Sequence, residues 1–218
     1  MTPTYLVFLG SARDSLPPRP ARLGLRVARA LMLQLHHRGV QAALVDPLDF
    51  DLGRSFKPHF AYAKGAAPAA LDKLAEKIER ADGYVMVSPE YNHSMSPALS
   101  HLLNHFGSSL FSYKPSVIAT YSAGQWGGVR AAVGMRGFLS ELGCLPVSAM
   151  IHVPKAQDVF TEDGSFHDGV AAGEWPGYMA RAFAQLDWWA KAAQQHRRIG
   201  DCPLPDAFIS DPSQRNTP

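Results

Sequence analysis

Residues 88–106 carry side chains that can bind a metal ion, transfer protons or hold a planar ligand. His101 and His105 lie one helical turn apart, and His93 would be a third metal ligand. No HExxH motif and no carboxylate on the same predicted helix accompany them. Since helical histidine pairs are most often surface or interface residues, metal binding is the weakest of the three interpretations.

Acid–base chemistry at this segment would use Glu90, although a single carboxylate after a strand is commonly a structural hydrogen-bond partner. The third interpretation is a site for a planar ligand. Pro89 stiffens the turn, Tyr91 supplies an aromatic wall, and Asn92 and the backbone amides supply donors for ring oxygens and nitrogens.

A second polar segment, GSARDS at residues 10–15, follows the first apolar run. Ser11 and Arg13 lie in it, and Arg19 and Arg22 lie near the start of the next predicted helix. Hydroxyls, guanidinium groups and free amides at a helix amino terminus together suit a phosphate. The segment has neither the GxGxxG of dinucleotide folds nor the GK[ST] of nucleotide-triphosphate loops. A turn capped by Ser11, with exposed arginines, is the alternative.

A third segment, SAGQWGG at residues 122–128, is rich in glycine and contains no general base. Glycines permit the backbone to approach a ligand closely, although an ordinary strand-to-helix turn has the same composition. The chain has no GxSxG motif, so nothing in it supports an α/β-hydrolase nucleophile.

The elements that position these segments alternate along the chain. Short apolar runs predict five strands, over residues 4–10, 40–46, 83–88, 116–122 and 145–151. Apolar residues at helical spacing predict five helices. Two of them cover about residues 22–38 and about residues 128–142. The other three are centred on Leu71, Leu74 and Ile78, on Leu99, Leu102, Leu103 and Phe106, and on Met179, Phe183, Leu186 and Ala190. Gly39 is placed to end the first helix. Such alternation predicts a parallel sheet with helices on both faces, because parallel strands need crossover connections.

In open parallel sheets, ligands bind outside the carboxyl ends of the strands. The three polar segments each follow a predicted strand, so a doubly wound fold would bring them together. Residues 47–68 are unusually long for a loop, which suggests a functional or interface role. Residues from about 199 onward lose their periodicity and gain prolines, which predicts an extended tail.

Composition sets limits on the class of protein. The 218 residues are 46% hydrophobic and 18% charged, which is typical of a globular domain. A net charge of +2 is too small to indicate a nucleic-acid surface, and no apolar run approaches the roughly 20 residues that cross a membrane. The amino terminus has no leader pattern and is expected to form the first strand. Two cysteines, Cys144 and Cys202, make no disulfide framework, so we expect a cytoplasmic protein, with Cys144 in the core.

Three segments together resemble the NADPH-dependent FMN reductase family of flavodoxin-like proteins: GSAR (10–13), PEYNHSMSPALSHLLNHF (89–106) and SAGQWGGVRA (122–131). The resemblance covers about residues 4–197. It implies an α/β, flavodoxin-like domain over residues 1–198, with a five-stranded parallel sheet in the order 2-1-3-4-5 and helices on both faces. Residues 199–218 would then be an extended C-terminal tail.

The resemblance also implies which residues bind FMN. Ser11 and Arg13 would bind its phosphate together with Arg19 or Arg22. RLG (22–24) matches a family motif, but LPPRP (16–20) is an insertion ahead of it. The remaining residues would surround the isoalloxazine ring: Pro89, Glu90, Tyr91, Asn92 and Ser94 would frame it, with His93 at the rim, and Ser122, Gly124, Gln125, Trp126 and Gly127 would close its other side.

The implied function is an FMN-dependent NAD(P)H oxidoreductase, with FMN as cofactor and NADPH or NADH as co-substrate. It would reduce a small-molecule acceptor such as a quinone, an azo compound or a flavin by a ping-pong mechanism. No catalytic side chain and no metal is expected, because the cofactor carries the redox chemistry. Family members are usually dimers or tetramers, and residues 47–68 and the His101/His105 helix are the interface candidates. The alternative is a flavodoxin-type electron carrier, which binds FMN without NAD(P)H activity of its own.

Overall fold

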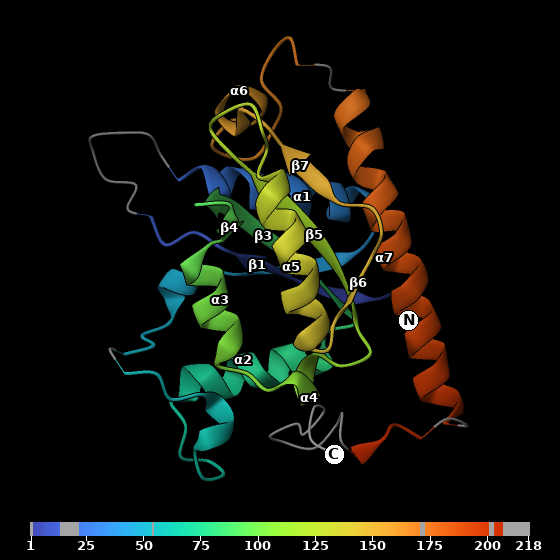
Figure 1. Ribbon diagram of the computed structural model, residues 1–218. Coiled ribbons are helices and arrows are strands. Elements are labelled where there is room, and N and C mark those ends of the chain that lie inside the picture. Colours follow the sequence, from blue (N-terminus) through green and yellow to red (C-terminus); the bar gives the residue numbers. More distant parts are fainter. Residues whose placement is uncertain (1, 14–21, 54, 171–172, 201–202, 207–218) are drawn as a thin grey trace.

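The centre of the protein is a parallel β-sheet (Figure 1). The structure is a computed structural model, and it describes residues 2–13, 22–53, 55–170, 173–200 and 203–206. The main strands lie in the order β2 (Gln41–Val45), β1 (Thr4–Leu9), β3 (Gly83–Tyr91), β5 (Pro115–Tyr121) and β6 (Leu145–Pro146). All four pairings along this path are parallel. The predicted flavodoxin-like order is therefore confirmed.

Two short strands were not predicted. β7 (Ile151–Val153) pairs with the end of β5, whereas β6 pairs with its start, so the single strand predicted over residues 145–151 is split in two. β4 (Ser94–Met95) pairs with β3 in the antiparallel direction. Both departures lie beside the carboxyl ends of β3 and β5, where the polar segments are.

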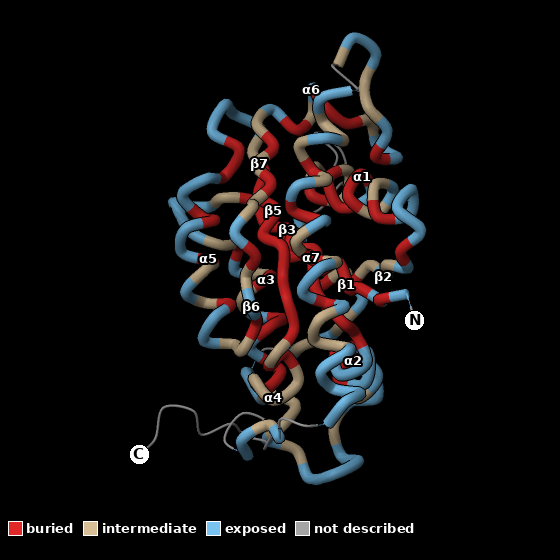
Figure 2. Tube along the Cα trace, turned by 90° about the vertical axis from the view of Figure 1, so that its right-hand side faces the viewer, coloured by how far each residue is buried: buried red, intermediate tan, exposed pale blue. Residues whose placement is uncertain are grey.

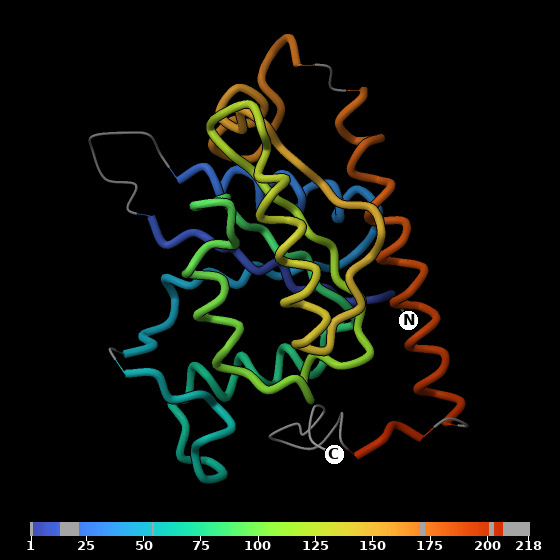
Figure 3. Tube along the Cα trace, viewed as in Figure 1, coloured from blue at the N-terminus to red at the C-terminus, as the bar shows by residue number. Residues whose placement is uncertain are grey.

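Helices cover both faces of the sheet, as predicted. α1 (Leu23–His37) and α7 (Glu174–Ile199) pack on one face, and α7 runs along the right-hand edge of the trace in Figure 3. The opposite face is covered by α2 (Ala69–Arg80), α3 (Pro97–Asn104), α4 (Ser108–Phe111) and α5 (Val129–Glu141). A further short helix is α6 (Ala156–Val159). Across the described ranges, no helix combines the length and the apolar character that crossing a bilayer requires.

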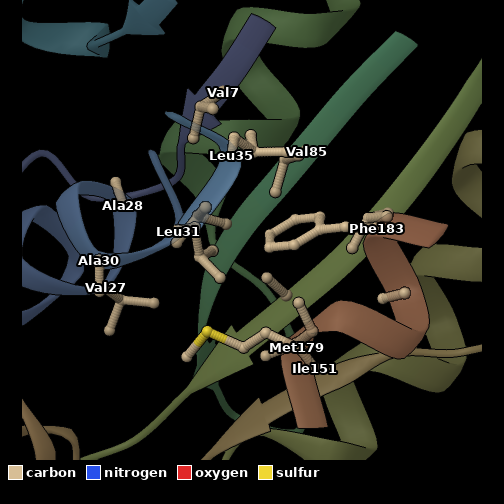
Figure 4. Close-up of a cluster of buried hydrophobic side chains, with 14 of the residues drawn as sticks. Val7, Val27, Ala28, Ala30, Leu31, Leu35, Val85, Ile151, Met179 and Phe183 are labelled. Carbon is tan, nitrogen blue, oxygen red and sulfur yellow. The ribbon is translucent and has the colours of Figure 1, made fainter. Parts of the chain in front are cut away.

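Apolar side chains form a core on each side of the sheet, because successive residues of a strand point to opposite faces. Figure 4 shows the core under α1 and α7, where Val7 and Val85 of the sheet meet Leu31 of α1 and Phe183 of α7. Figure 2 shows buried residues concentrated in the central strands and exposed residues on the outer helix surfaces. Cys144 lies in the second core, as predicted, and Cys202 lies outside the described residues.

Helix ends follow the expected chemistry. Ser96 caps α3 by accepting hydrogen bonds from the amides of Ala98 and Leu99, and Pro97 occupies the first turn. Gly39 follows α1 with a φ of 73°, the left-handed conformation in which glycine ends helices. α7 continues to Ile199, the residue at which the tail was predicted to begin.

Residues 47–68 contain two short 3-10 helices, η1 (Pro47–Asp49) and η2 (His59–Ala61). The His105 ring packs 4.9 Å from the Phe56 ring, and its Nδ1 donates to the Lys57 carbonyl oxygen. His105 is only 1% exposed, because this segment packs over it. The contacts hold the segment against α3. The expectation that His105 contributes to an interface is therefore wrong for its side chain, whereas His101 on the same helix is exposed.

Lys114 is a buried lysine that connects the start of β5 to α2 and α4. Its Nζ donates to the carbonyl oxygens of Ile78 and Glu79 at 2.7 Å and of Leu110 at 2.9 Å, which occupies all three ammonium donors. Burial and the charge of Arg197 lower the pKa of Lys114 to about 8, so the group is still mostly protonated at neutral pH. The ammonium thus ties the start of β5 to the end of α2 and to α4.

We predict that Lys114→Met lowers the free energy of unfolding by about 2 kcal/mol, because the Glu79 carbonyl oxygen loses the ammonium donor and the Ile78 and Leu110 carbonyl oxygens keep only the Tyr84 hydroxyl. Urea denaturation measures this change. The matched control is Lys191→Met on the exposed surface of α7, which should change stability by less than about 0.5 kcal/mol. Equal effects of the two substitutions would contradict a bridging role for Lys114.

Candidate functional site

The three polar segments lie at the carboxyl ends of three adjacent strands. Leu9 pairs with Val87, and Pro89 pairs with Tyr121, so β1, β3 and β5 end at neighbouring positions. The amide of Gly10 donates to the carbonyl oxygen of Val87 at 2.6 Å. A Cβ atom at Gly10 would lie 2.6 Å from that same oxygen, so only glycine lets the chain leave β1 here. The convergence predicted from the sequence is therefore present.

Ser11 and Arg13 follow Gly10 at the amino-terminal side of α1. Ser11 is 4% exposed, and its Oγ accepts a hydrogen bond from the Arg13 amide at 3.4 Å. The Arg13 residue itself is exposed. Among the described residues, the position before α1 makes no side-chain capping hydrogen bond. The combination of a buried hydroxyl, an exposed arginine and the amino terminus of a helix suits a phosphate group.

Arg22 lies directly before α1 and is buried in an ion pair. Its two terminal nitrogens lie 2.5 and 2.7 Å from the two carboxylate oxygens of Asp46, and Asp46 also accepts from the Leu48 amide. This pair joins the start of α1 to the end of β2. A phosphate-binding role for Arg22 stays a prediction, and Arg19 and the 16–20 insertion lie outside the described residues.

Residues 90–95 form a β-hairpin in which a two-residue turn joins β3 to β4. Tyr91 pairs with Ser94, and Asn92 and His93 form the turn with φ angles of 50° and 61°. Two successive left-handed residues are the geometry of a type I′ turn, at which asparagine is favoured. Tyr91 is 46% exposed, so this segment presents an aromatic residue beside the polar loops.

Glu90 anchors the hairpin to α5. Its carboxylate accepts from the Arg130 side chain at 2.7 Å and from the Arg130 and Ala131 amides at 3.1 and 3.3 Å. Burial raises the pKa of Glu90, but these hydrogen bonds outweigh it and hold the pKa below its ordinary value. A carboxylate that is held ionised in this way serves as a helix anchor, which favours the structural interpretation over acid–base chemistry.

Residues 122–128 form a tight loop stabilised by Ser122. Its hydroxyl donates to the Gly124 carbonyl oxygen at 2.8 Å and accepts from the Gly127 amide at 2.9 Å. Gly127 has a φ of 60°, and a Cβ there would lie 3.0 Å from the backbone nitrogen of Pro154. Gln125 and Trp126 lie at the exposed side of this loop, and Trp126 is 59% exposed.

Three residues that support these loops were not singled out from the sequence. Arg130 holds Glu90 and lies 5.9 Å from the centre of the Trp126 ring. Thr120 donates to the Gly127 carbonyl oxygen and accepts from Nδ1 of His152, each at 2.8 Å. The position of Arg130 just after a glycine-rich loop is a signal that could have been noticed. His152 is distant in sequence, and nothing local indicates its role.

The described residues contain no group of three or more histidine, cysteine, aspartate or glutamate side chains that could hold a metal ion. Grooves of about 620 and 430 Å³ lie at the opposite end of the sheet, beside Leu145 and Trp189. Their linings are mainly apolar, and they lie far from the strand ends that carry the polar segments. We therefore place the candidate site at the carboxyl ends of β1, β3 and β5.

The sequence profile described as NADPH-dependent FMN reductase matches residues 3–158, which include all three strand ends. The chain belongs to this family. A solved structure of a flavoenzyme, an NAD(P)H:(acceptor) oxidoreductase of Paracoccus denitrificans, aligns with a TM-score of 0.65 at 22% identity. The alignment covers 87% of this chain and 98% of that one, and it supports the shared fold.

Curated relatives in the FMN reductase family match shorter segments. An NAD(P)H-dependent FMN reductase of Pseudomonas aeruginosa is 32% identical over 114 residues, which is 50% of this chain and 61% of the relative. A quinone reductase of Escherichia coli is 39% identical over 81 residues, which is 36% of this chain and 43% of the relative. The chain thus matches less than two thirds of the length of these relatives.

We predict that Gly24→Ala disturbs the candidate site. The new Cβ would lie 2.3 Å from the Tyr121 hydroxyl and 3.0 Å from the Ser11 Cβ. Overpacking of this kind costs about 1–3 kcal/mol, which exceeds the gain of about 1 kcal/mol from replacing a helical glycine. Thermal unfolding should therefore show a lower midpoint.

The control for this substitution is Gly134→Ala in α5, where a Cβ atom would meet nothing within 4 Å. That variant should be as stable as the parent or more stable. If both variants gained stability, α1 would not be closely packed against the end of β5.

Proposed function

We propose that this protein is an FMN-dependent NAD(P)H oxidoreductase of the cytoplasm that reduces a small-molecule acceptor. The observation that carries the proposal is the convergence of three family-matched segments at one edge of the sheet, after β1, β3 and β5. The relatives include enzymes named for FMN, quinone and azo reduction, which suggests the classes of acceptor.

The described residues suit both the phosphate and the ring system of FMN. Ser11, Arg13 and the amino terminus of α1 offer donors and positive charge to the phosphate. The exposed Tyr91 and Trp126 rings, on the hairpin and on the 122–128 loop, offer apolar surface to a planar ring system. Asn92, Ser94, Gly124 and Gln125 belong to the same two turns and would supply the remaining polar contacts.

Bound FMN would supply the redox chemistry, by accepting hydride from NAD(P)H and passing electrons to the acceptor in a second half-reaction. The chain's own share is binding and positioning. Ser11 and Arg13 would hold the phosphate, while the turns after β3 and β5 would fix the plane of the ring. The Glu90–Arg130 pair would keep those two turns in register with each other. Association into a dimer or tetramer through residues 47–68 is part of the proposal.

The proposal predicts that the purified chain binds FMN stoichiometrically and that anaerobic NADPH bleaches the bound flavin absorbance. Initial rates at several fixed quinone concentrations should then give parallel double-reciprocal lines. A chain that binds no FMN would contradict the proposal. Tight FMN binding without bleaching by NADPH or NADH would instead identify an electron carrier of the flavodoxin type.

A second prediction concerns the phosphate contact. Arg13→Ala should weaken FMN binding by more than about 1.5 kcal/mol, because it removes a charged hydrogen-bond donor. Flavin fluorescence titration measures the affinity. Arg80→Ala removes the same charge from the exposed end of α2 and should leave the affinity unchanged. Unchanged affinity in Arg13→Ala would remove Arg13 from the phosphate site.

A further inference from the structure

A turn at residues 155–157, which begins α6, is bonded to the loop at residues 122–128. Three successive carbonyl oxygens of the loop accept hydrogen bonds from the three residues of this turn. The pairs are the Ala156 amide with Ser122 at 3.0 Å, Gln157 Nε2 with Ala123 at 3.1 Å, and the Lys155 amide with Gly124 at 2.9 Å. Gln157 is the only one of the three that donates from its side chain, so its contribution can be removed by substitution.

The direction of these carbonyl groups fixes the direction of the amides that follow them. In a trans peptide, the C=O and the next N–H point to opposite sides of the chain. Because the carbonyl groups of residues 122–124 face the turn, the amides of residues 123–125 face away from it. Residues 123–125 are exposed, and among the residues that the structure describes no acceptor bonds to their amides. The loop therefore presents a row of three amide donors at the candidate site.

The turn holds the loop at a local cost. Lys155 has a φ of 45° and a ψ of 50°, a left-handed conformation that is unfavourable for a residue with a side chain. The Oε1 atom of Gln157 is buried and, within the described part of the chain, has no hydrogen-bond partner. Backbone strain and unsatisfied buried polar atoms concentrate where a structure serves function rather than stability. These two costs therefore indicate that the turn serves the loop that it holds.

We propose that Gln157 is a positioning residue for the flavin ring, because it holds the Ala123 carbonyl oxygen and so directs the amides of residues 123–125 toward the ring. The proposal rests on the proposed function, and it concerns the ring rather than the phosphate. Gln157 acts only through the loop, since its donor group is already bonded to Ala123. Reduction adds electron density to the ring, so the amide donors would bind the reduced ring more tightly than the oxidised ring.

Gln157→Met tests the proposal, because methionine has a similar length and no donor. Redox titration of the bound flavin measures the two-electron midpoint potential of FMN in the parent and in the variant. We expect reduced FMN to lose about tenfold more affinity than oxidised FMN, which lowers the midpoint potential by about 30 mV. An unchanged midpoint potential would overturn the proposal.

Riboflavin, which has the same ring and no phosphate, separates the ring from the phosphate. Dissociation constants of oxidised FMN and oxidised riboflavin are measured by fluorescence titration on the full chain. Gln157→Met should weaken the binding of both flavins by the same factor, because both carry the ring. A loss confined to FMN would place the effect at the phosphate and would overturn the proposal.

Gln185→Met is the matched control. Oε1 of Gln185 accepts a hydrogen bond from the Ala149 amide at 3.0 Å, so the same substitution removes another bond between a side chain and the backbone. This variant should lose stability and keep the parent's midpoint potential and flavin affinities. A fall in the potential as large as that of Gln157→Met would show that the potential reports general loosening, and the proposal would be wrong.

Gly124→Ala tests the row of amides without disturbing the fold. A Cβ atom at Gly124 would meet nothing within 4 Å, so thermal unfolding should show an unchanged or higher midpoint. The added methyl group would keep a ring from approaching the amides closely, and we expect the binding of FMN and of riboflavin to weaken about fivefold. Unchanged binding of both flavins would show that the ring does not meet this loop and would overturn the proposal.

These outcomes distinguish the proposal from the proposed function on which it rests. If the parent chain bound neither FMN nor riboflavin, the proposed function itself would fail. If the parent bound FMN and NADPH reduced it, while Gln157→Met kept the parent's midpoint potential, only the role of Gln157 would fail.

Discussion

The parallel register of β1, β3 and β5 is the constraint on which the candidate site depends. Because the three strands end at neighbouring positions, loops that are up to about 110 residues apart in sequence meet at one edge. The contact between the Gly10 amide and the Val87 carbonyl oxygen fixes where the first loop leaves the sheet. The two apolar cores hold the strands in this register from both faces.

Much of this arrangement could be predicted from the sequence. Short apolar runs and helical spacing identify the central strands and the long helices, since burial on both faces leaves a strong pattern in β1, β3 and β5. The predicted strand over residues 145–151 is split, because it lies at the edge of the sheet and pairs with β5 only at its two ends. Edge pairing of this kind leaves little trace in hydrophobic periodicity.

Contacts between distant segments could not be predicted in the same way. Glu90 was open to an acid–base interpretation until Arg130, forty residues later in the chain, was seen to hold it ionised. Arg22 was one of two arginines considered for the phosphate, and nothing near it in the sequence indicated its ion pair with Asp46. His105 was assigned to an interface, and instead it packs against Phe56 of its own chain. In each case the residue type was informative, whereas its partner depends on tertiary packing.

The Glu90–Arg130 anchor also divides the candidate site into residues that can vary and residues that cannot. Tyr91 and Trp126 flank the anchor with exposed rings that contribute little to the packed core. Glu90 ties the hairpin to α5 through three donor groups, so its replacement would loosen both turns together. On the proposed function, a library intended to broaden the range of acceptors would therefore randomise positions 91 and 126 and keep the anchor intact.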